Sequence, residues 1–263
     1  MKVATIQFCP TFKDVQGNLR RLAALTMKAA QAGARLIVLP ELALSGYSMM
    51  NRAAAEALSE VLTEFKPSPT PSLGSSMQVF YSIARTYGTH VVWGVLEKDL
   101  ATDKLFNSQV LMCPDGGFES YRKINFFGND YLWASEGRAN PPIRKIVVDD
   151  SSGGGEKHRV IKVGLLICRD VRDKKDDNWK SFYESGDADI VCLSANWGDG
   201  GFPATAWMDF AKDNKATLIV SNRYGKEVPN NFGEGGVCII SPDGTVQCEG
   251  LVWGQDCIVY GEV

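Results

Sequence analysis

Histidine is scarce in this sequence and long apolar runs are absent, and these two absences argue against several classes of protein. The 263 residues include two His, His90 and His158, and neither lies beside another candidate in a recognisable motif. A Cys–His or Ser–His nucleophile system and a His/Cys metal cluster are therefore poorly supported. The longest apolar runs, such as 36–40 and 163–168, are far below the roughly 20 residues of a membrane-spanning helix. We expect no membrane association, no metal and no cofactor.

Common catalytic and nucleotide-binding signatures are missing as well. The chain has no G-x-S-x-G, H-E-x-x-H or G-x-x-x-x-G-K-[ST] motif, and no G-x-G-x-x-G follows a strand-like run. Serine hydrolases with a nucleophile elbow, zincins, P-loop NTPases and dinucleotide-binding enzymes therefore lack their signatures here. A net charge of -3, from 28 Lys+Arg against 31 Asp+Glu, argues against a nucleic-acid-binding protein.

Cysteine is present, but in a pattern that indicates reduced thiols. The seven Cys are an odd number, are scattered along the chain and form no C-x-x-C pair. In a chain of this length the pattern predicts buried, reduced thiols and a cytoplasmic protein, instead of a disulfide framework. An apolar content of 44% and a charged content of 22% are typical of a globular domain with an ordinary core.

Strand-like and helix-like segments alternate along the chain, and no linker divides it. Hydrophobic spacing and turn residues predict helices at 18–32, 53–65, 72–87, 179–185 and 204–214, and strands at 3–8, 35–39, 89–96, 106–112, 160–168, 188–194, 216–221, 237–241 and 245–248. The segments 125–142 and 197–203 are aromatic- and Gly-rich and long enough to be functional loops. The pattern predicts one α/β domain over residues 1–263 with a mixed sheet arrangement.

Three chemically useful residues directly follow strand-like runs. Glu41 comes after the run 36–40, where its alternatives are a helix cap or a surface acid. Lys123 follows a strand-like segment, and on its own such a residue is more often a solvated edge lysine. Cys168 ends an apolar strand, and its alternative is a buried structural thiol. The abrupt change to Cys-Arg-Asp favours an exposed sulfur in a cationic neighbourhood, which lowers a thiol pKa.

Together these segments are more specific than any one of them. The matching pieces are 39–47 (LPELALSGY), 121–124 (YRKI) and 164–172 (GLLICRDVR), with supporting matches at 196–197, 221–225 and 241–244. In this order and at these separations they resemble the carbon–nitrogen hydrolase, or nitrilase, superfamily. The resemblance covers nearly the whole chain and implies a single-domain, four-layer α–β–β–α sandwich that forms a homodimer or a higher homo-oligomer.

The resemblance also implies a Glu–Lys–Cys triad, which maps onto Glu41, Lys123 and Cys168. A thiol needs a base, and Glu41 can serve if burial raises its pKa toward neutrality. The ammonium of Lys123 and the backbone N–H of Arg169 can stabilise an oxyanion. Sulfur attack then divides amide hydrolysis into an acylation and a deacylation step.

Members of the family often carry a second glutamate in the loop after the lysine. This chain offers Asp130 and Glu136 there, and the spacing back from the Gly-containing element at 136–137 favours Asp130. The further residues that the resemblance suggests for substrate binding are Tyr47, Arg172, Asn196 and Trp197.

The leading functional prediction is an amidase that hydrolyses a small, non-peptide, linear amide. An N-carbamoyl amide hydrolase is the main alternative, because a guanidinium such as that of Arg172 can bind a substrate carboxylate through two hydrogen bonds. Nitrilases usually show Cys-Trp-Glu at the nucleophile, and the Cys-Arg-Asp of this chain shifts the weight toward amides. A glutaminase subunit and a non-catalytic regulatory module of the same fold remain as further alternatives.

Overall fold

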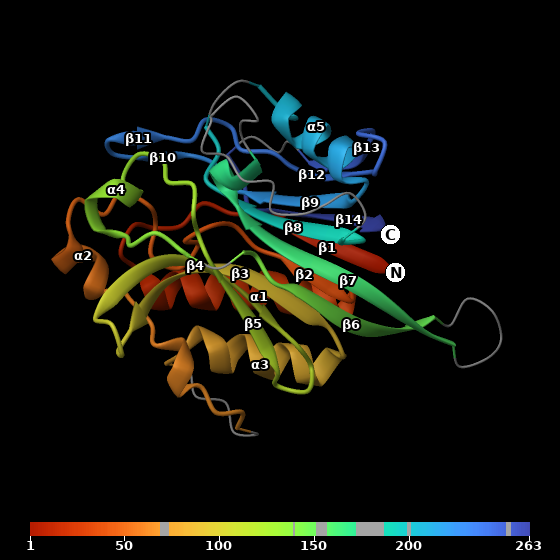
Figure 1. Cartoon of the computed structure of the whole chain (residues 1–263), viewed down its shortest axis with the longest axis horizontal. Coiled ribbons are helices and arrows are strands. Elements are labelled where there is room, and N and C mark those ends of the chain that lie inside the picture. Colours follow the sequence, from red (N-terminus) through yellow and green to blue (C-terminus); the bar gives the residue numbers. More distant parts are fainter. Residues whose placement is uncertain (69–73, 139, 151–156, 172–186, 199–200, 251–253) are drawn as a thin grey trace.

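The computed structural model describes residues 1–68, 74–138, 140–150, 157–171, 187–198, 201–250 and 254–263. Two β-sheets are stacked face to face, and helices cover their outer faces (Figure 1). This is the mixed α/β sandwich that the sequence predicts, in a single domain. No helix in the described part of the chain is both long and apolar enough to cross a membrane.

Each sheet has six strands with a parallel centre. The first has the order β14-β1-β2-β3-β4-β5, formed by Cys257–Glu262 (β14), Lys2–Gln7 (β1), Leu36–Val38 (β2), His90–Asp99 (β3), Lys104–Met112 (β4) and Phe118–Arg122 (β5). The second has the order β13-β12-β9-β8-β7-β6, formed by Val246–Gly250 (β13), Val237–Ile240 (β12), Thr217–Asn222 (β9), Ile190–Ala195 (β8), Lys157–Ile167 (β7) and Ile143–Asp150 (β6). Strands β1–β3 and β7–β9 run parallel, and the outer pairs are antiparallel.

The helices form the two outer layers. Helices α1 (Val15–Gln31) and α3 (Ser76–Tyr87) pack on the first sheet, and α5 (Thr205–Asn214) packs on the second. Asp14 caps α1 by accepting a hydrogen bond from the Gly17 N–H, and Gly88 ends α3 in a left-handed conformation. The short helices are α2 (Arg52–Glu56), α4 (Asp130–Trp133) and the 3-10 turns Leu62–Glu64 and Cys168–Val171.

Buried hydroxyl and amide groups join the two sheets across an otherwise apolar interface. Gln109 of β4 donates to Ser194 of β8 at 2.8 Å, and the Ser194 hydroxyl donates to the Leu39 carbonyl at 2.7 Å. The Ser221 hydroxyl at the end of β9 donates to the carbonyl of Ile6 in β1 at 2.6 Å. These hydrogen bonds fix how the strand ends of one sheet lie against those of the other.

Some predicted elements differ from the structure. The predicted helix at 53–65 is wrong beyond residue 56, because Glu60 forms a parallel bridge with Glu97 of β3 and its carboxylate caps the start of α3 through Ser76. Strands β6 and β14 were not predicted, and α4 interrupts the loop predicted at 125–142. The predicted helix at 179–185 lies outside the described residues.

Candidate active site

The three residues of the predicted triad meet at one end of the sandwich. Glu41 lies three residues after β2, Lys123 directly follows β5, and Cys168 directly follows β7. The first two strands belong to one sheet and the third belongs to the other, so the site lies between the sheets. All three residues are buried, with exposed fractions of 1%, 1% and 6%.

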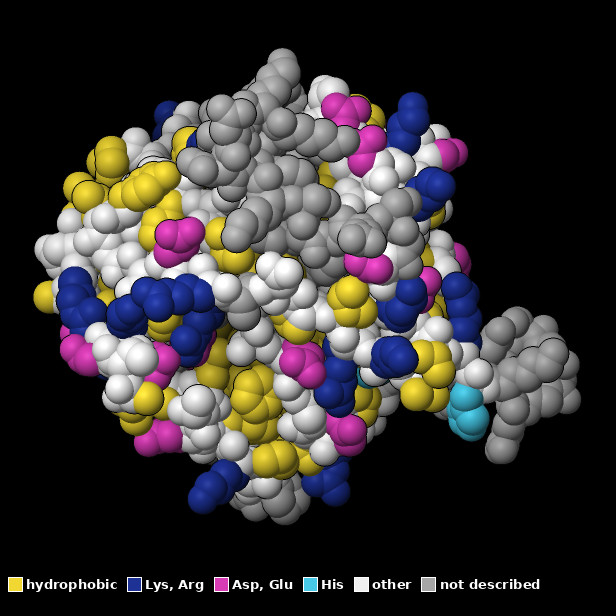
Figure 2. Space-filling view, in the orientation of Figure 1, with side chains coloured by type: hydrophobic (Ala, Val, Ile, Leu, Met, Phe, Trp, Pro, Cys, Tyr) yellow, Lys and Arg dark blue, Asp and Glu magenta, His cyan; other side chains and the backbone are white. Residues whose placement is uncertain are grey.

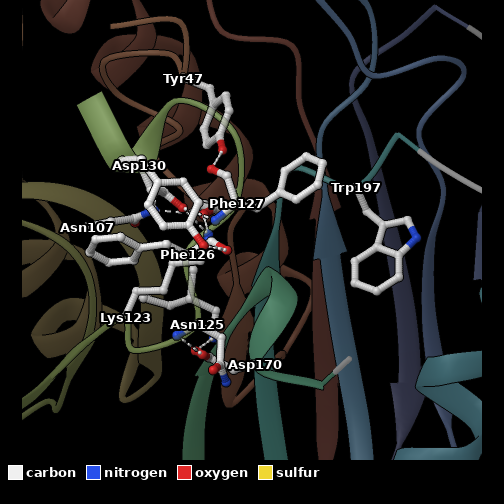
Figure 3. A network of polar contacts seen from close by, with 12 residues as sticks. Tyr47, Asn107, Lys123, Asn125, Phe126, Phe127, Asp130, Asp170 and Trp197 are labelled. Atoms are coloured by element: carbon white, nitrogen blue, oxygen red, sulfur yellow. Dashed lines mark hydrogen bonds and ion pairs between the residues drawn. The ribbon is translucent and has the colours of Figure 1, made fainter. Parts of the chain in front are cut away.

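The Lys123 ammonium lies between two carboxylates. Its Nζ donates to Glu41 Oε1 at 2.7 Å and to Asp130 Oδ2 at 2.7 Å. Burial opposes the charge of Lys123, but Asp130 and Glu41 outweigh it and hold the Lys123 pKa well above its usual range. Lys123 is therefore a fixed cation, and Figure 3 shows it close to Asp130 and Asn107.

Asn107 of β4 completes this cluster and was not predicted from the sequence. Its Nδ2 donates to Glu41 Oε1 at 2.7 Å and to Asp130 Oδ1 at 3.1 Å, so one amide joins both acids. The amide adds no charge of its own. An Asn in a predicted strand gives no local signal for such a role, because its partners come from elements distant in the sequence.

Of the two candidate second acids, the structure brings only Asp130 to the cluster. Asp130 begins α4, is fully buried and also accepts the Phe127 backbone N–H at 3.1 Å. Glu136 is exposed and lines a separate cavity of about 440 Å³ beside β5, together with Arg122 and Arg138.

The two carboxylate oxygens of Glu41 have different surroundings. Oε1 accepts hydrogen bonds from Lys123 and Asn107, whereas Oε2 is buried and has no hydrogen-bond partner among the described residues. Burial, and behind it the negative charge of Asp130, raise the Glu41 pKa, although Lys123 acts against them. Glu41 thus has one anchored oxygen and one oxygen available to accept a proton.

Cys168 lies on a strained turn at the end of β7. Its φ of 46° is in the left-handed region that residues with a side chain rarely adopt. Burial and the nearby Glu41 raise the pKa of its thiol, while Lys123 and the backbone N–H of Asn196 lower it by less. The predicted exposed sulfur is therefore wrong: Cys168 is buried, and desolvation raises the pKa of its thiol instead of lowering it.

Tyr47 is held between the cluster and a buried ion pair. Its hydroxyl donates to the Phe127 carbonyl, as Figure 3 shows, and its backbone N–H donates to Glu227 Oε1 at 2.7 Å. The other oxygen of Glu227 accepts from Arg223 Nη1 at 2.8 Å, and both side chains are almost completely buried. Neither Arg223 nor Glu227 was predicted, although Arg223 lies within the supporting match at 221–225.

Asn196 and Trp197 lie at the end of β8, on the Cys168 side of the site. Both side-chain polar atoms of Asn196 are buried without a hydrogen-bond partner among the described residues. Asn222 fixes the Trp197 backbone by accepting from its N–H at 2.8 Å and donating to its carbonyl at 3.1 Å. Trp197 lines a cavity of about 220 Å³ with Phe202, Trp207 and Phe232 among others.

The remaining predicted residues are only partly placed. Arg169 follows Cys168 in the 3-10 turn, and its guanidinium carbon lies 5.8 Å from the centre of the Phe127 ring. Arg172 lies outside the described residues. Within the described ranges, no group of three or more His, Cys, Asp and Glu side chains is arranged to hold a metal ion.

The surface next to the cluster is apolar on one side. Met50, Tyr131, Leu132 and Val228 are large apolar side chains with exposed fractions of 57%, 71%, 49% and 87%. Figure 2 shows hydrophobic side chains gathered over the region of α4, β10 (Lys226–Glu227) and β11 (Asn230–Asn231).

Comparison with known proteins places this chain in a family. A model of the carbon–nitrogen hydrolase family matches residues 2–263, so the chain belongs to that family. A protein of Pyrococcus abyssi named nitrilase is 28% identical over 233 residues, covering 86% of this chain and 76% of the relative. A protein of Schizosaccharomyces pombe named protein N-terminal amidase is 24% identical over 300 residues, covering 100% and 99%.

Solved structures agree on the fold. An amidase from Nesterenkonia sp. AN1 superposes with a TM-score of 0.75 at 20% identity, covering 100% of this chain and 93% of that chain. A carbon–nitrogen hydrolase superfamily protein from Xanthomonas campestris gives 0.75 at 20% identity, covering 99% and 89%. The predicted family and fold class are confirmed, and at this identity the likeness extends to the fold alone.

Proposed function

We propose that this protein hydrolyses a small, non-peptide amide to a carboxylic acid and ammonia, with Cys168 as the nucleophile and a thioester intermediate. The observation that carries the proposal is the asymmetry of Glu41. One of its oxygens is anchored by Lys123 and Asn107, and the other is buried and unpaired. An unpaired buried oxygen is costly, and a proton taken from a thiol or from water would satisfy it.

The raised pKa of Cys168 supports a base-assisted attack. A buried thiol near Glu41 stays protonated at neutral pH, so the sulfur needs an acceptor for its proton as it reacts. In the proposed step, Glu41 Oε2 takes the thiol proton while Sγ bonds to the amide carbon. The negative charge that develops on the carbonyl oxygen is stabilised by Lys123 Nζ and the backbone N–H of Arg169.

Two proton transfers complete the proposed cycle. Glu41 gives the proton to the amide nitrogen, the C–N bond breaks and ammonia leaves a thioester on Cys168. Water then attacks the thioester carbon and gives a proton to Glu41. The C–S bond breaks, the sulfur takes the proton back and the carboxylic acid is released.

Asp130 and Asn107 have a supporting role in this scheme. Both hold the partners of the reacting groups, since Asp130 binds Lys123 and Asn107 binds Glu41. The negative charge of Asp130 also favours protonation of Glu41. The buried, unpaired side chain of Asn196, beside the sulfur, is proposed to bind the substrate.

The test is ammonia release from a panel of short aliphatic amides, ω-amidodicarboxylates, glutamine, N-carbamoyl compounds and nitriles. Turnover of the amides supports the proposal. Preference for carbamoyl compounds, glutamine or nitriles would contradict the amidase proposal and would support the N-carbamoyl hydrolase, glutaminase or nitrilase alternative, respectively. No turnover of any class would favour a non-catalytic module.

The nucleophile is tested by Cys168→Ala beside a matched control, Cys192→Ala. Cys192 is completely buried in β8, and burial alone raises the pKa of its thiol. Cys168→Ala should lower turnover by more than about a thousandfold, and Cys192→Ala should leave it unchanged once folding is verified. Turnover of Cys168→Ala within about tenfold of the wild type would contradict the assignment.

A further inference from the structure

Asp170 carries a buried charge that the proposed reaction does not use. It lies two residues after Cys168, and its exposed fraction is 0%. Its Oδ2 accepts the Tyr121 hydroxyl at 2.9 Å and the Ile167 backbone N–H at 3.0 Å, and its Oδ1 accepts the Asn125 backbone N–H at 3.0 Å. These three donors are neutral, so the carboxylate is held by hydrogen bonds, as Figure 3 shows for Asn125.

The three donors flank the reacting groups. Tyr121 and Asn125 each lie two residues from Lys123, on either side of it, and Ile167 directly precedes Cys168. One carboxylate therefore joins the end of β5 in the first sheet to the end of β7 in the second. The segment that carries the Lys123 ammonium donates two hydrogen bonds to Asp170, and the segment that carries the Cys168 sulfur donates one.

The backbone at Cys168 needs such a tie. A left-handed conformation at a non-glycine residue is strained, and it persists only where surrounding contacts enforce it. The hydrogen bond from the Ile167 N–H to Asp170 closes the 3-10 turn over Cys168. Without it, the sulfur can move away from the direction of Lys123.

We infer that Asp170 is a positioning residue, whose carboxylate fixes the Lys123 ammonium against the Cys168 sulfur by holding Tyr121, Asn125 and Ile167. The inference rests on the proposed roles of Lys123 and Cys168. A displacement of about 1 Å within such a site is enough to cost on the order of a hundredfold in rate.

The substitution Asp170→Asn separates positioning from a simple charge effect, because the two predict opposite signs. Removing a negative charge near the sulfur favours the thiolate and makes alkylation of Cys168 faster. Losing the tether moves Lys123 away from the sulfur, raises the thiol pKa further and makes alkylation slower. The Asn side chain keeps the shape of Asp, but only its oxygen accepts hydrogen bonds. Its NH2 group cannot accept from a backbone N–H as the second carboxylate oxygen does.

The experiment measures the rate of Cys168 alkylation by iodoacetamide, located by peptide mass, together with kcat and KM. For Asp170→Asn we expect alkylation and kcat to fall about tenfold to a hundredfold while KM stays unchanged. The matched control is Asp189→Asn. Asp189 also accepts a backbone N–H of β7, from Lys162 at 2.8 Å, but it is exposed and directly precedes β8, at the end opposite to Asn196.

Alkylation of Asp170→Asn at or above the wild-type rate, with the fold intact, would overturn the inference. If Asp170→Asn does not fold, Tyr121→Phe removes one of the three donors and should slow the alkylation of Cys168 by a smaller factor. An unchanged alkylation rate in Tyr121→Phe would also overturn the inference. The alkylation comparison needs no substrate. A wild-type protein that hydrolyses nothing in the panel therefore defeats the proposed function, while the rates of the variants still decide the role of Asp170.

Discussion

Glu41 and Gly94 touch backbone to backbone. A Cβ added to Gly94 would lie 2.5 Å from the Glu41 Cα and 2.5 Å from the Leu42 nitrogen, and Leu42 itself has a φ of 46°. The Gly94 N–H donates to the Pro40 carbonyl at 3.1 Å, directly before the glutamate. A contact between two backbones cannot be relieved by rotating a side chain, so the absence of a side chain at Gly94 sets the position of Glu41.

Gly94→Ala should therefore displace Glu41 and reduce turnover by on the order of a hundredfold, with a loss of about 1–3 kcal/mol in the free energy of unfolding. Turnover and urea unfolding measure the two effects. Gly117→Ala is the control, because its added Cβ meets only the ends of the Arg144 and Asp115 side chains, at 3.1 Å. Wild-type turnover in Gly94→Ala would show that the backbone of Glu41 can move without loss.

The roles proposed for Glu41 and Lys123 are separable by single-turnover kinetics with an activated ester or amide. Glu41→Gln removes the proton acceptor and should slow both acylation and deacylation. Lys123→Ala removes the positive charge that stabilises the oxyanion. It should lower the rates by on the order of a hundredfold or more, as for other oxyanion contacts. Because the residues act as one unit, the double variant should lose less than the product of the single losses.

Glu136→Gln is the matched control for this series, since Glu136 is an exposed acid on the same loop as Asp130. It should behave as the wild type. Near wild-type rates for Glu41→Gln would instead make Glu41 a bystander and would direct the search for the base to Asp130.

The positions of Glu41, Lys123 and Cys168 were predictable because each follows a strand directly or within three residues, and these strand ends lie close together where the two sheets pack. The choice between Asp130 and Glu136 was not settled by spacing alone, because both lie in one loop. Only the short helix that begins at Asp130 turns that carboxylate toward Lys123.

Other features depend on contacts that sequence patterns do not encode. The strand-to-polar change at Cys168 indicated an exposed sulfur, but the residue is buried in a core cluster formed by segments distant in the sequence. The apolar spacing at 53–65 predicted one helix, yet Glu60 leaves it to pair with Glu97. Asn107 and Glu227 act through partners 66 and 180 residues away, and no local pattern predicts such pairs.

The buried ion pair of Arg223 and Glu227 should dominate stability near Tyr47. Glu227→Gln leaves the Arg223 charge buried without its counter-charge and weakens the anchor of the Tyr47 and Ser48 N–H groups. We expect a loss of about 3–5 kcal/mol in the free energy of unfolding, measured in urea. Glu119→Gln breaks the partly exposed pair with Arg144 and should cost about 1 kcal/mol or less. Equal losses in the two variants would mean that burial of the Arg223–Glu227 pair does not increase the cost of breaking it, measured as free energy of unfolding.

The pH dependence of stability provides a test of Asp170 that does not involve activity. Burial raises the pKa of the Asp170 carboxyl to about 6, against an ordinary value of 3.8, so the folded protein holds this proton more tightly than the unfolded chain. Its contribution to stability is therefore complete below about pH 4 and is lost as the pH rises through about 6.

Asp170→Asn cannot titrate, while Glu41 and the other acids titrate in both proteins and cancel in the difference. The free energy of unfolding of the wild type minus that of Asp170→Asn should therefore fall by roughly 1–3 kcal/mol between about pH 4 and pH 7. Urea unfolding at a series of pH values measures this difference. A difference that rises with pH would mean that the three hydrogen bonds to Asp170 outweigh its burial and that the ionised carboxylate stabilises the fold. A fall would mean that the ionised carboxylate is kept at a cost in stability, as expected of a residue retained to position the site.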